Sequence, residues 1–189
     1  ALDRYLPKVN VKPATIHRAM RYSLFAGGKR LRPILTLAAA EACGGKVERA
    51  LPFACAIECV HTYSLVHDDL PSMDNDDFRR GRPTCHKVFG DGIAVLAGDA
   101  LLTIAFEILS DGAPPSRYNM SLLLRELAVA AGSQKLIAGQ VADLEAEGKK
   151  VDRAQLRFIH ANKTAAILTT AVRLGAMSAN ANSKDLEAI

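Results

Sequence analysis

One long segment of the chain, Leu51–Leu70, carries apolar side chains on nearly all of its sides. A helix with this profile is stable only when other elements cover most of its surface. Pro71 ends the segment, because its ring removes a backbone donor and clashes with the preceding turn. Most of the apolar residues of the chain are Ala and Leu, which favour helices, and only 5% of all residues are aromatic. The sequence therefore predicts a core helix surrounded by other helices.

Glycine and proline residues divide the rest of the chain into further helical segments. No alternating pattern typical of a β-strand extends beyond four residues. We therefore expect an all-α fold in which residues 1–189 form a single helical domain. The expected helices are Ala14–Phe25, Leu31–Cys43, Leu51–Leu70, Ile93–Leu109, Tyr118–Ala131, Ser133–Ala146, Arg153–Ala176 and a last one that starts at Ser183.

Charge and composition exclude several classes of protein. The formal net charge of +4 is too small to indicate a nucleic-acid binder. No stretch of about 18 residues is apolar and free of charge, so we expect no membrane span. The first residues lack the pattern of a signal peptide, and the four cysteines show no disulfide spacing. Cys55 and Cys59 are expected to fill the core, and reduced thiols favour a cytoplasmic protein.

Five aspartates gather at the end of the predicted core helix: Asp68, Asp69, Asp74, Asp76 and Asp77. Carboxylates on an apolar helix are costly unless they are paired or bind a metal. A divalent cation relieves their mutual repulsion, and oxygen ligands of this kind suit Mg²⁺, which usually binds one or two carboxylates together with substrate phosphates. The cluster therefore predicts a magnesium site.

The spacing of these aspartates requires the helix to end between them. On an unbroken helix, Asp68 and Asp74 would point about 120° apart, at about 100° per residue. Pro71 lies between them. The chain is therefore expected to bulge there and bring Asp74 back toward Asp68. The alternative is an acidic helix end followed by a solvated loop, but a helix cap needs one aspartate and not five.

Basic residues form two further clusters. The stretch GGKRLRP (Gly27–Pro33) places Lys29 and Arg32 at the start of a helix, where backbone N–H groups and positive side chains together favour an anion. Arg79 and Arg80 directly follow the acidic cluster. One phosphate site at the metal and a second at the basic residues fit two diphosphate ligands with an apolar space between them.

Five stretches of the sequence together resemble the trans-isoprenyl diphosphate synthases, a family that includes farnesyl and geranylgeranyl diphosphate synthases. The resemblance runs from about Tyr22 to about Leu174. It implies a bundle of antiparallel helices around a deep apolar cavity, and a homodimer. The stretches are GGKRLRP, HTYSLVHDDLPSMDNDDFRRGRPTCHK, LAGDALL, GQVADL and HANKTA.

The resemblance also implies a role for individual residues. Asp68, Asp69 and Asp74 resemble the Mg²⁺ ligands of the first aspartate-rich motif, with Asp69 in support. Arg79 resembles the residue that binds the allylic diphosphate. The residues that resemble the isopentenyl diphosphate site are Gly28, Lys29, Arg32, His61 and Arg80, and those that resemble further substrate-binding positions of the family are Gln140, Asp143, Lys163 and Thr164.

The resemblance implies a Mg²⁺-dependent, head-to-tail condensation of isopentenyl diphosphate with dimethylallyl or geranyl diphosphate. Tyr63 lies five residues before Asp68, about one and a half turns deeper along the helix. In the family an aromatic side chain at this place goes with short products, so Tyr63 is expected to form the floor of the cavity. Farnesyl diphosphate is then favoured over geranylgeranyl diphosphate. The alternative is that Tyr63 packs between helices and its hydroxyl bonds elsewhere.

The family carries a second aspartate-rich motif that these 189 residues do not contain. We therefore expect the sequence to be the N-terminal two-thirds of such a domain, and inactive by itself. Two alternative functions compete with this prediction. A metal-dependent phosphohydrolase would explain the pair His67–Asp68 but not the arginines or GGKRLRP. A non-catalytic diphosphate-binding subunit would be expected to lack an aspartate of the first motif.

Overall fold

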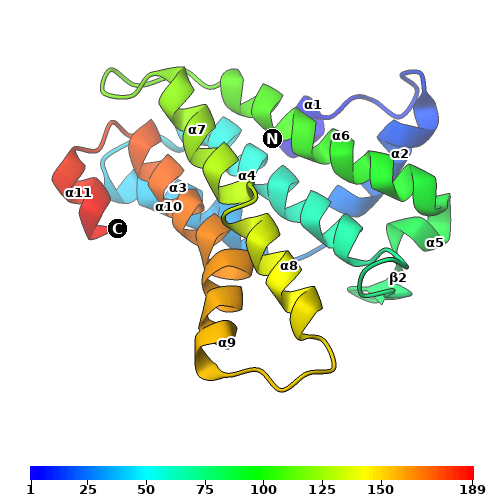
Figure 1. Cartoon of the computed structure of the whole chain (residues 1–189). Helices are drawn as coiled ribbons and strands as arrows, with labels where there is room; N and C mark the ends of the chain where they lie inside the picture. Colours follow the sequence, from blue (N-terminus) through cyan, green and yellow to red (C-terminus); the bar gives the residue numbers. More distant parts are fainter. The chain divides into compact units, whose positions relative to one another are not determined.

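The structure is a computed structural model that describes all residues, 1–189. It confirms the predicted all-α class, since helices are interrupted only by one hairpin of two very short strands (Figure 1). The elements in chain order are α1 (Leu2–Tyr5), α2 (Ala14–Leu24), α3 (Leu31–Ala42), α4 (Val47–Asp68), β1 (Phe78–Arg79), β2 (Arg82–Pro83), α5 (Cys85–Phe89), α6 (Asp91–Ser110), α7 (Met120–Ala131), α8 (Leu136–Ala146), α9 (Arg153–Ile159), the π-helical segment η1 (His160–Ala165), α10 (Ala166–Ser178) and α11 (Ser183–Ala188).

The chain forms two compact units. The first unit comprises Ala1–Arg30 and Glu58–Ile108, and the second comprises Leu31–Ile57 and Leu109–Ile189. Each unit has its own buried apolar side chains, and each carries a different set of the residues that the sequence singled out. The units are therefore described separately.

In the first unit, α2 and the end of α4 support the hairpin and the start of α6. The hydroxyl of Tyr22 in α2 donates a hydrogen bond to the carbonyl of Pro83 in β2, at 2.8 Å. The imidazole of His67 in α4 contacts the carbonyl of Val95 in α6, with Nε2 and O 3.0 Å apart. Gly98 permits this approach, because a Cβ atom there would collide with the His67 ring. The two contacts fix the elements that flank the aspartate-rich segment.

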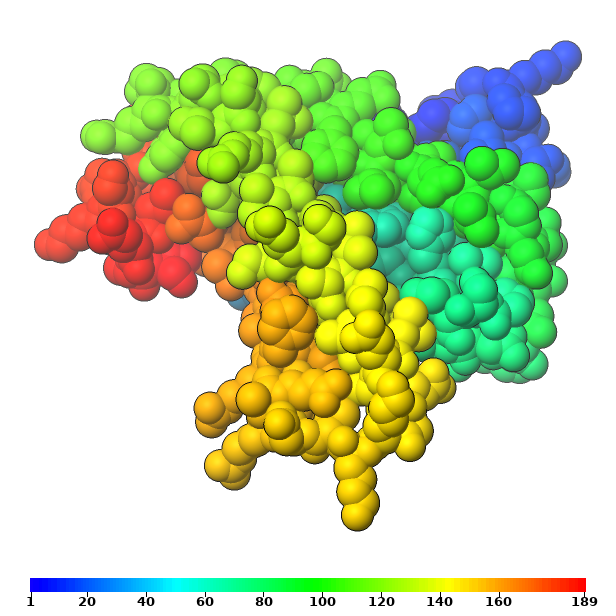
Figure 2. All heavy atoms as spheres, in the orientation of Figure 1, coloured from blue at the N-terminus to red at the C-terminus, as the bar shows by residue number.

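In the second unit, α3 and α10 pack closely because small residues line their contact. A Cβ atom at Gly175 would collide with the backbone carbonyl of Thr36, so only glycine fits there. The side chains of Leu174 and Ala171 are fully buried in α10. Farther along the chain, α8 and α9 lie side by side, as the yellow and orange segments of Figures 1 and 2 show.

Two predicted helices differ most from those observed. The core helix α4 begins at Val47 instead of Leu51, and Pro52 lies inside it. Pro52 lacks the N–H that would otherwise bond to the carbonyl of Glu48, so α4 has one helical bond fewer near its start. The segment predicted as one helix, Arg153–Ala176, is divided by the π-helical segment η1. Cys55 and Cys59 are buried and form no disulfide, as predicted.

Only α6 is long and apolar enough to match a membrane span by length and composition, with a hydropathy of 1.9 over its best window. Nevertheless, 44% of that window is buried inside the protein. Ala97, Leu101 and Ala105 are fully buried in the core. Since the core helices of compact proteins meet the same criteria, α6 gives no clear sign of a membrane span.

Candidate functional site

The aspartate-rich segment turns back on the end of α4. After Pro71, the backbone N–H of Asp74 donates to the carbonyl of Asp68 at 2.9 Å, and that of Asn75 donates to Leu70 at 3.0 Å. On a continuous helix, residues 68 and 74 would be separated by about 9 Å along the axis, at about 1.5 Å per residue. The reversal thus returns Asp74 to the helix end, as the position of Pro71 predicts.

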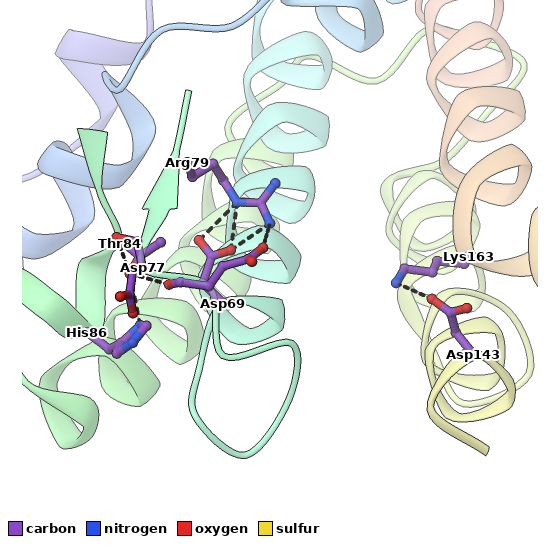
Figure 3. A network of polar contacts seen from close by, with 8 residues as sticks. Asp69, Asp77, Arg79, Thr84, His86, Asp143 and Lys163 are labelled. Carbon is purple, nitrogen blue, oxygen red and sulfur yellow. Dashed lines mark hydrogen bonds and ion pairs between the residues drawn. The ribbon is translucent and has the colours of Figure 1, made fainter. Parts of the chain in front are cut away.

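Asp69 holds Arg79 through several contacts of its buried carboxylate (Figure 3). Nε of Arg79 donates to both oxygens, at 2.7 and 2.9 Å, and Nη2 lies 2.5 Å from Oδ1. Burial raises the pKa of the Asp69 carboxyl, and the hydrogen bond and charge of Arg79 oppose that rise. The bond to Asp69 in turn raises the pKa of Arg79. Asp69 therefore fixes the orientation of Arg79, and its predicted part in binding Mg²⁺ stays a prediction.

The carboxylates of Asp68 and Asp74 fit a magnesium ion chemically. Asp68 is 8% exposed at the helix end, and Asp74 is exposed on the returning loop. No group of three or more His, Cys, Asp or Glu side chains in residues 1–189 is arranged to hold an ion by itself. Mg²⁺ does not need such a group, because waters and substrate phosphates usually complete its six oxygen ligands. The donors present are thus suited to a metal that arrives with a diphosphate.

The hairpin that follows places Arg80 at a strained position. The two central residues of its turn, Arg80 and Gly81, have φ angles of 54° and 75°, as in a type I′ turn. Nη1 of Arg80 donates to the carbonyl of Gly27. A Cβ atom at Gly28 would lie 2.5 Å from Cζ of Arg80. Burial lowers the pKa of Arg80. The structure thus brings together Arg80 and the glycine pair that precedes the exposed Lys29.

An ion pair with a buried carboxylate, which the sequence did not predict, lies beside this glycine pair. The side chain of Glu58 is 2% exposed, and its Oε1 accepts a bond from Nη1 of Arg30. Nη2 of Arg30 also donates to the carbonyl of Leu24, at 2.5 Å, at the end of α2. Arg30 itself has a φ of 52°, which few residues other than glycine adopt. A charged residue inside an otherwise apolar helix is the signal that could have identified Glu58.

In the second unit, the motifs GQVADL and HANKTA meet. Nζ of Lys163 lies 2.7 Å from Oδ2 of Asp143, which joins η1 to α8 (Figure 3). Gly139 permits this approach, because a Cβ atom there would collide with the backbone of Lys163. The amide Nε2 of Gln140 is buried and has no hydrogen-bond partner. It is therefore a donor that a ligand could satisfy.

The HANKTA motif coincides with the π-helical segment η1. Short π-helical turns inside α-helices are rare and frequently occur at functional sites. The side chain of Asn162 is buried and donates to the carbonyl of Phe158 at 2.9 Å, which satisfies a backbone group where the hydrogen-bond pattern changes. The interruption of the predicted helix therefore falls at the residues that resemble a substrate site.

The remaining predicted residues have fewer described contacts. His61 is half-buried in α4, Arg32 is half-buried in the first turn of α3, and Thr164 is exposed in η1. Tyr63 is buried, and its ring packs edge-on against His67 with the centroids 5.7 Å apart. Its predicted role as a cavity floor remains a prediction.

The second unit also has a hollow that lies elsewhere. It has a volume of about 680 Å³ and is lined by residues of α7, η1, α10 and α11 and of the loops before α7 and α8, among them Tyr118, Arg125 and Arg173. Arg173 forms an ion pair with Glu126 at its edge. None of the residues predicted from the sequence to bind substrate or metal lines it. It is therefore not the predicted substrate site.

Known proteins resemble this chain over nearly its whole length. It is 50% identical over 187 residues to the farnesyl diphosphate synthase of Geobacillus stearothermophilus, covering 97% of this chain and 62% of that protein. It is 52% identical over 180 residues to the chloroplastic geranylgeranyl pyrophosphate synthase of Capsicum annuum, covering 93% and 48%. The crystal structure of a FPP/GFPP synthase from Zymomonas mobilis superposes with a TM-score of 0.88 at 40% identity, covering 98% of this chain and 68% of that one.

These comparisons also set the extent of the match. The chain spans between about half and 62% of the length of the curated relatives just named. A family model described as polyprenyl synthetase matches residues 13–189, which is nearly all of the chain. The chain therefore belongs to the polyprenyl synthetase family.

Proposed function

We propose that the protein to which this chain belongs is a short-chain prenyltransferase that condenses isopentenyl diphosphate with an allylic diphosphate in a Mg²⁺-dependent, head-to-tail reaction. One observation carries the proposal. The reversal after Pro71 returns Asp74 to Asp68 at the end of α4, and the neighbouring Asp69 forms an ion pair with Arg79. This arrangement offers oxygen ligands for a metal and a fixed guanidinium for a diphosphate. The names of the relatives, farnesyl and geranylgeranyl diphosphate synthases, support the same reaction.

The residues of this chain would bind the two diphosphates and hold them in position. Arg79, held by Asp69, would bind the diphosphate that leaves the allylic substrate, because a guanidinium matches phosphate oxygens in two parallel hydrogen bonds. Lys29 and Arg80 would hold the second diphosphate at the glycine pair. Mg²⁺ held by Asp68 and Asp74 would neutralise charge on the leaving diphosphate.

The test is an elongation assay on the full-length protein with isopentenyl diphosphate, dimethylallyl diphosphate and Mg²⁺. We expect chain elongation, with farnesyl diphosphate as the main product. A main product of twenty carbons would support the alternative, a geranylgeranyl diphosphate synthase, which the likeness to the Capsicum annuum protein favours. Tight diphosphate binding without elongation would instead indicate a non-catalytic subunit.

Arg79 and Arg80 are expected to serve different substrates although they are adjacent. Arg79→Ala should raise the KM for the allylic substrate, and Arg80→Ala should raise the KM for isopentenyl diphosphate. The reason is that Asp69 positions the Arg79 side chain, whereas the backbone of the glycine pair positions that of Arg80. Loss of a hydrogen bond to a charged group costs about 1.5–3 kcal/mol of binding free energy, which corresponds to a rise in KM of roughly 10- to 150-fold. Initial-rate kinetics with each substrate varied would measure both. Identical profiles for the two variants would refute this division.

Tyr63 is expected to limit product length. The buried ring lies near the middle of the part of α4 that belongs to the first unit, and its replacement in Tyr63→Ala removes most of its volume. We expect products longer by at least one isoprene unit, measured by chromatography of the dephosphorylated alcohols. Tyr118→Ala, a change of the same size in the second unit, serves as the control. Unchanged products in the Tyr63 variant would mean that the ring packs only between helices.

A further inference from the structure

Thr84 lies at the point where the aspartate-rich loop meets the hairpin and α5. The residue is 2% exposed and directly precedes α5. Its backbone N–H donates to the carbonyl of Asp77 at 3.0 Å, and its hydroxyl donates to the carbonyl of Asp76 at 2.8 Å. One buried residue thus binds two consecutive carbonyls at the end of the loop that carries Asp74.

The hydroxyl of Thr84 does not serve its usual purpose at such a position. A threonine before a helix normally accepts a bond from a backbone N–H of the first turn, whereas no such bond is made here. Instead, Oγ1 lies 3.1 Å from Nδ1 of His86, a side chain that is 5% exposed (Figure 3). Because the hydroxyl hydrogen goes to the carbonyl of Asp76, the hydroxyl oxygen accepts a hydrogen bond from the Nδ1–H group of His86. His86 therefore fixes the direction in which the hydroxyl points.

A second contact ties the same loop to α5. Nζ of Lys87 lies 2.7 Å from Oδ1 of Asp77, and this bond lowers the pKa of Asp77. Both groups are largely exposed, so the pair contributes little by itself. The buried bonds of Thr84 are therefore the stronger constraint on the end of the loop.

The loop is thus fixed at both ends. At its start, the N–H of Asp74 bonds to the end of α4, and at its end Thr84 holds Asp76 and Asp77. The bond between Thr84 and Asp77 also extends the pairing of the hairpin, in which Phe78 faces Pro83. A substitution at Thr84 would therefore alter the positions of Asp74 in the loop and of Arg79 in the hairpin.

We propose that Thr84, oriented by His86, is a positioning residue that holds the aspartate-rich loop in the conformation that binds Mg²⁺ with a diphosphate. Thr84 and His86 themselves contact neither the metal nor the substrate. They act through the backbone of Asp76 and Asp77 on the carboxylate of Asp74. The inference rests on the proposed function, because that function supplies the metal and the diphosphate.

The test compares Thr84→Val, which removes the hydroxyl at nearly equal volume, with Thr84→Ser, which keeps it. In the full-length protein, we expect the valine variant to need about tenfold more Mg²⁺ for half-maximal elongation, the order of change that loss of a group supporting a metal ligand produces. The serine variant should behave like the wild type. Ser178→Ala, which removes another buried hydroxyl bond to a backbone carbonyl, at 2.7 Å in α10, is the matched control.

A second measurement does not depend on turnover. Amide hydrogen exchange of residues 74–84 is recorded with and without Mg²⁺ and inorganic pyrophosphate. We expect the wild type and Thr84→Ser to become protected when both are added, and Thr84→Val to remain faster in exchange. If Thr84→Val does not fold, His86→Leu takes its place. His86→Asn, which keeps a donor near the Nδ1 position, then serves as its conservative partner.

The outcomes separate the two proposals. A wild type that shows protection by Mg²⁺ and pyrophosphate but no elongation would refute the proposed function and leave the role of Thr84 standing. A valine variant, or its His86→Leu substitute, with the Mg²⁺ dependence and the protection of the wild type would overturn the positioning role. A lower Tm with both readouts unchanged would likewise show that the hydroxyl only stabilises the fold.

Discussion

Replacing Asp68 or Asp74 with alanine is expected to lower the kcat of the full-length protein by about 100-fold or more. The reason is that each variant removes one of two proposed metal ligands, the carboxylate of Asp68 at the end of α4 or that of Asp74 on the loop that returns to it. Metal stabilisation of developing charge is worth several kcal/mol, and each 1.4 kcal/mol is about tenfold in rate. The measurement is kcat at saturating substrates over a range of Mg²⁺ concentrations.

The fold should survive these changes. Asp74 is exposed, and its backbone bond to Asp68 does not involve the side chain. Circular dichroism spectra and Tm values close to those of the wild type are therefore expected. Asp111→Ala, at an exposed aspartate of a different loop, is the control and should keep the wild-type kcat. Near-wild-type turnover in both Asp68→Ala and Asp74→Ala would contradict the magnesium assignment.

The second large effect is expected on stability, at the ion pair of Arg30 with the buried Glu58. Glu58→Gln keeps the shape of the side chain but leaves the Arg30 guanidinium without its counter-ion. Because Glu58 is almost fully buried, we expect the free energy of unfolding to fall by about 3 kcal/mol, the lower end of the range for breaking a buried ion pair. Urea denaturation followed by circular dichroism would measure it.

The chain offers a matched control for this prediction. Glu126 also pairs with an arginine, Arg173, but both side chains of that pair are partly exposed. Glu126→Gln is therefore expected to cost less than about 1 kcal/mol. A double variant, Arg30→Met with Glu58→Leu, should recover much of the stability lost in Glu58→Gln, because it leaves no buried charge unpaired. Equal losses in the two single variants would show that burial does not govern the effect.

The features that depend on neighbours in sequence could be predicted. Pro71 between Asp68 and Asp74 requires the helix to end, and the structure contains that reversal. Glycine pairs and apolar periodicity placed most helices within a few residues of their observed bounds. These signals are local, since a proline ring or a glycine acts on the turn to which it belongs.

The features that depend on contacts between distant segments could not be predicted. The approach of η1 to α8 depends on Gly139, which lies more than twenty residues before Lys163. The partnership of Arg30 with Glu58 crosses 28 positions. The hairpin has strands of two residues, too short for an alternating pattern to show. In each case the determining partner is close in space and remote in sequence.

The π-helical segment η1 has a consequence for how this part of the chain tolerates change in length. Its bonds run from residue i to i+5 instead of i+4, so its turn holds one residue more than an α-helical turn. Deleting a single residue such as Ala161 would let α9 and α10 join into one uninterrupted α-helix. Helical content would be preserved, and α9 and α10 would keep nearly the same rotation relative to each other, because the wider turn takes up the one residue that is removed. We therefore expect this turn to tolerate the loss of one residue while Lys163 still faces Asp143.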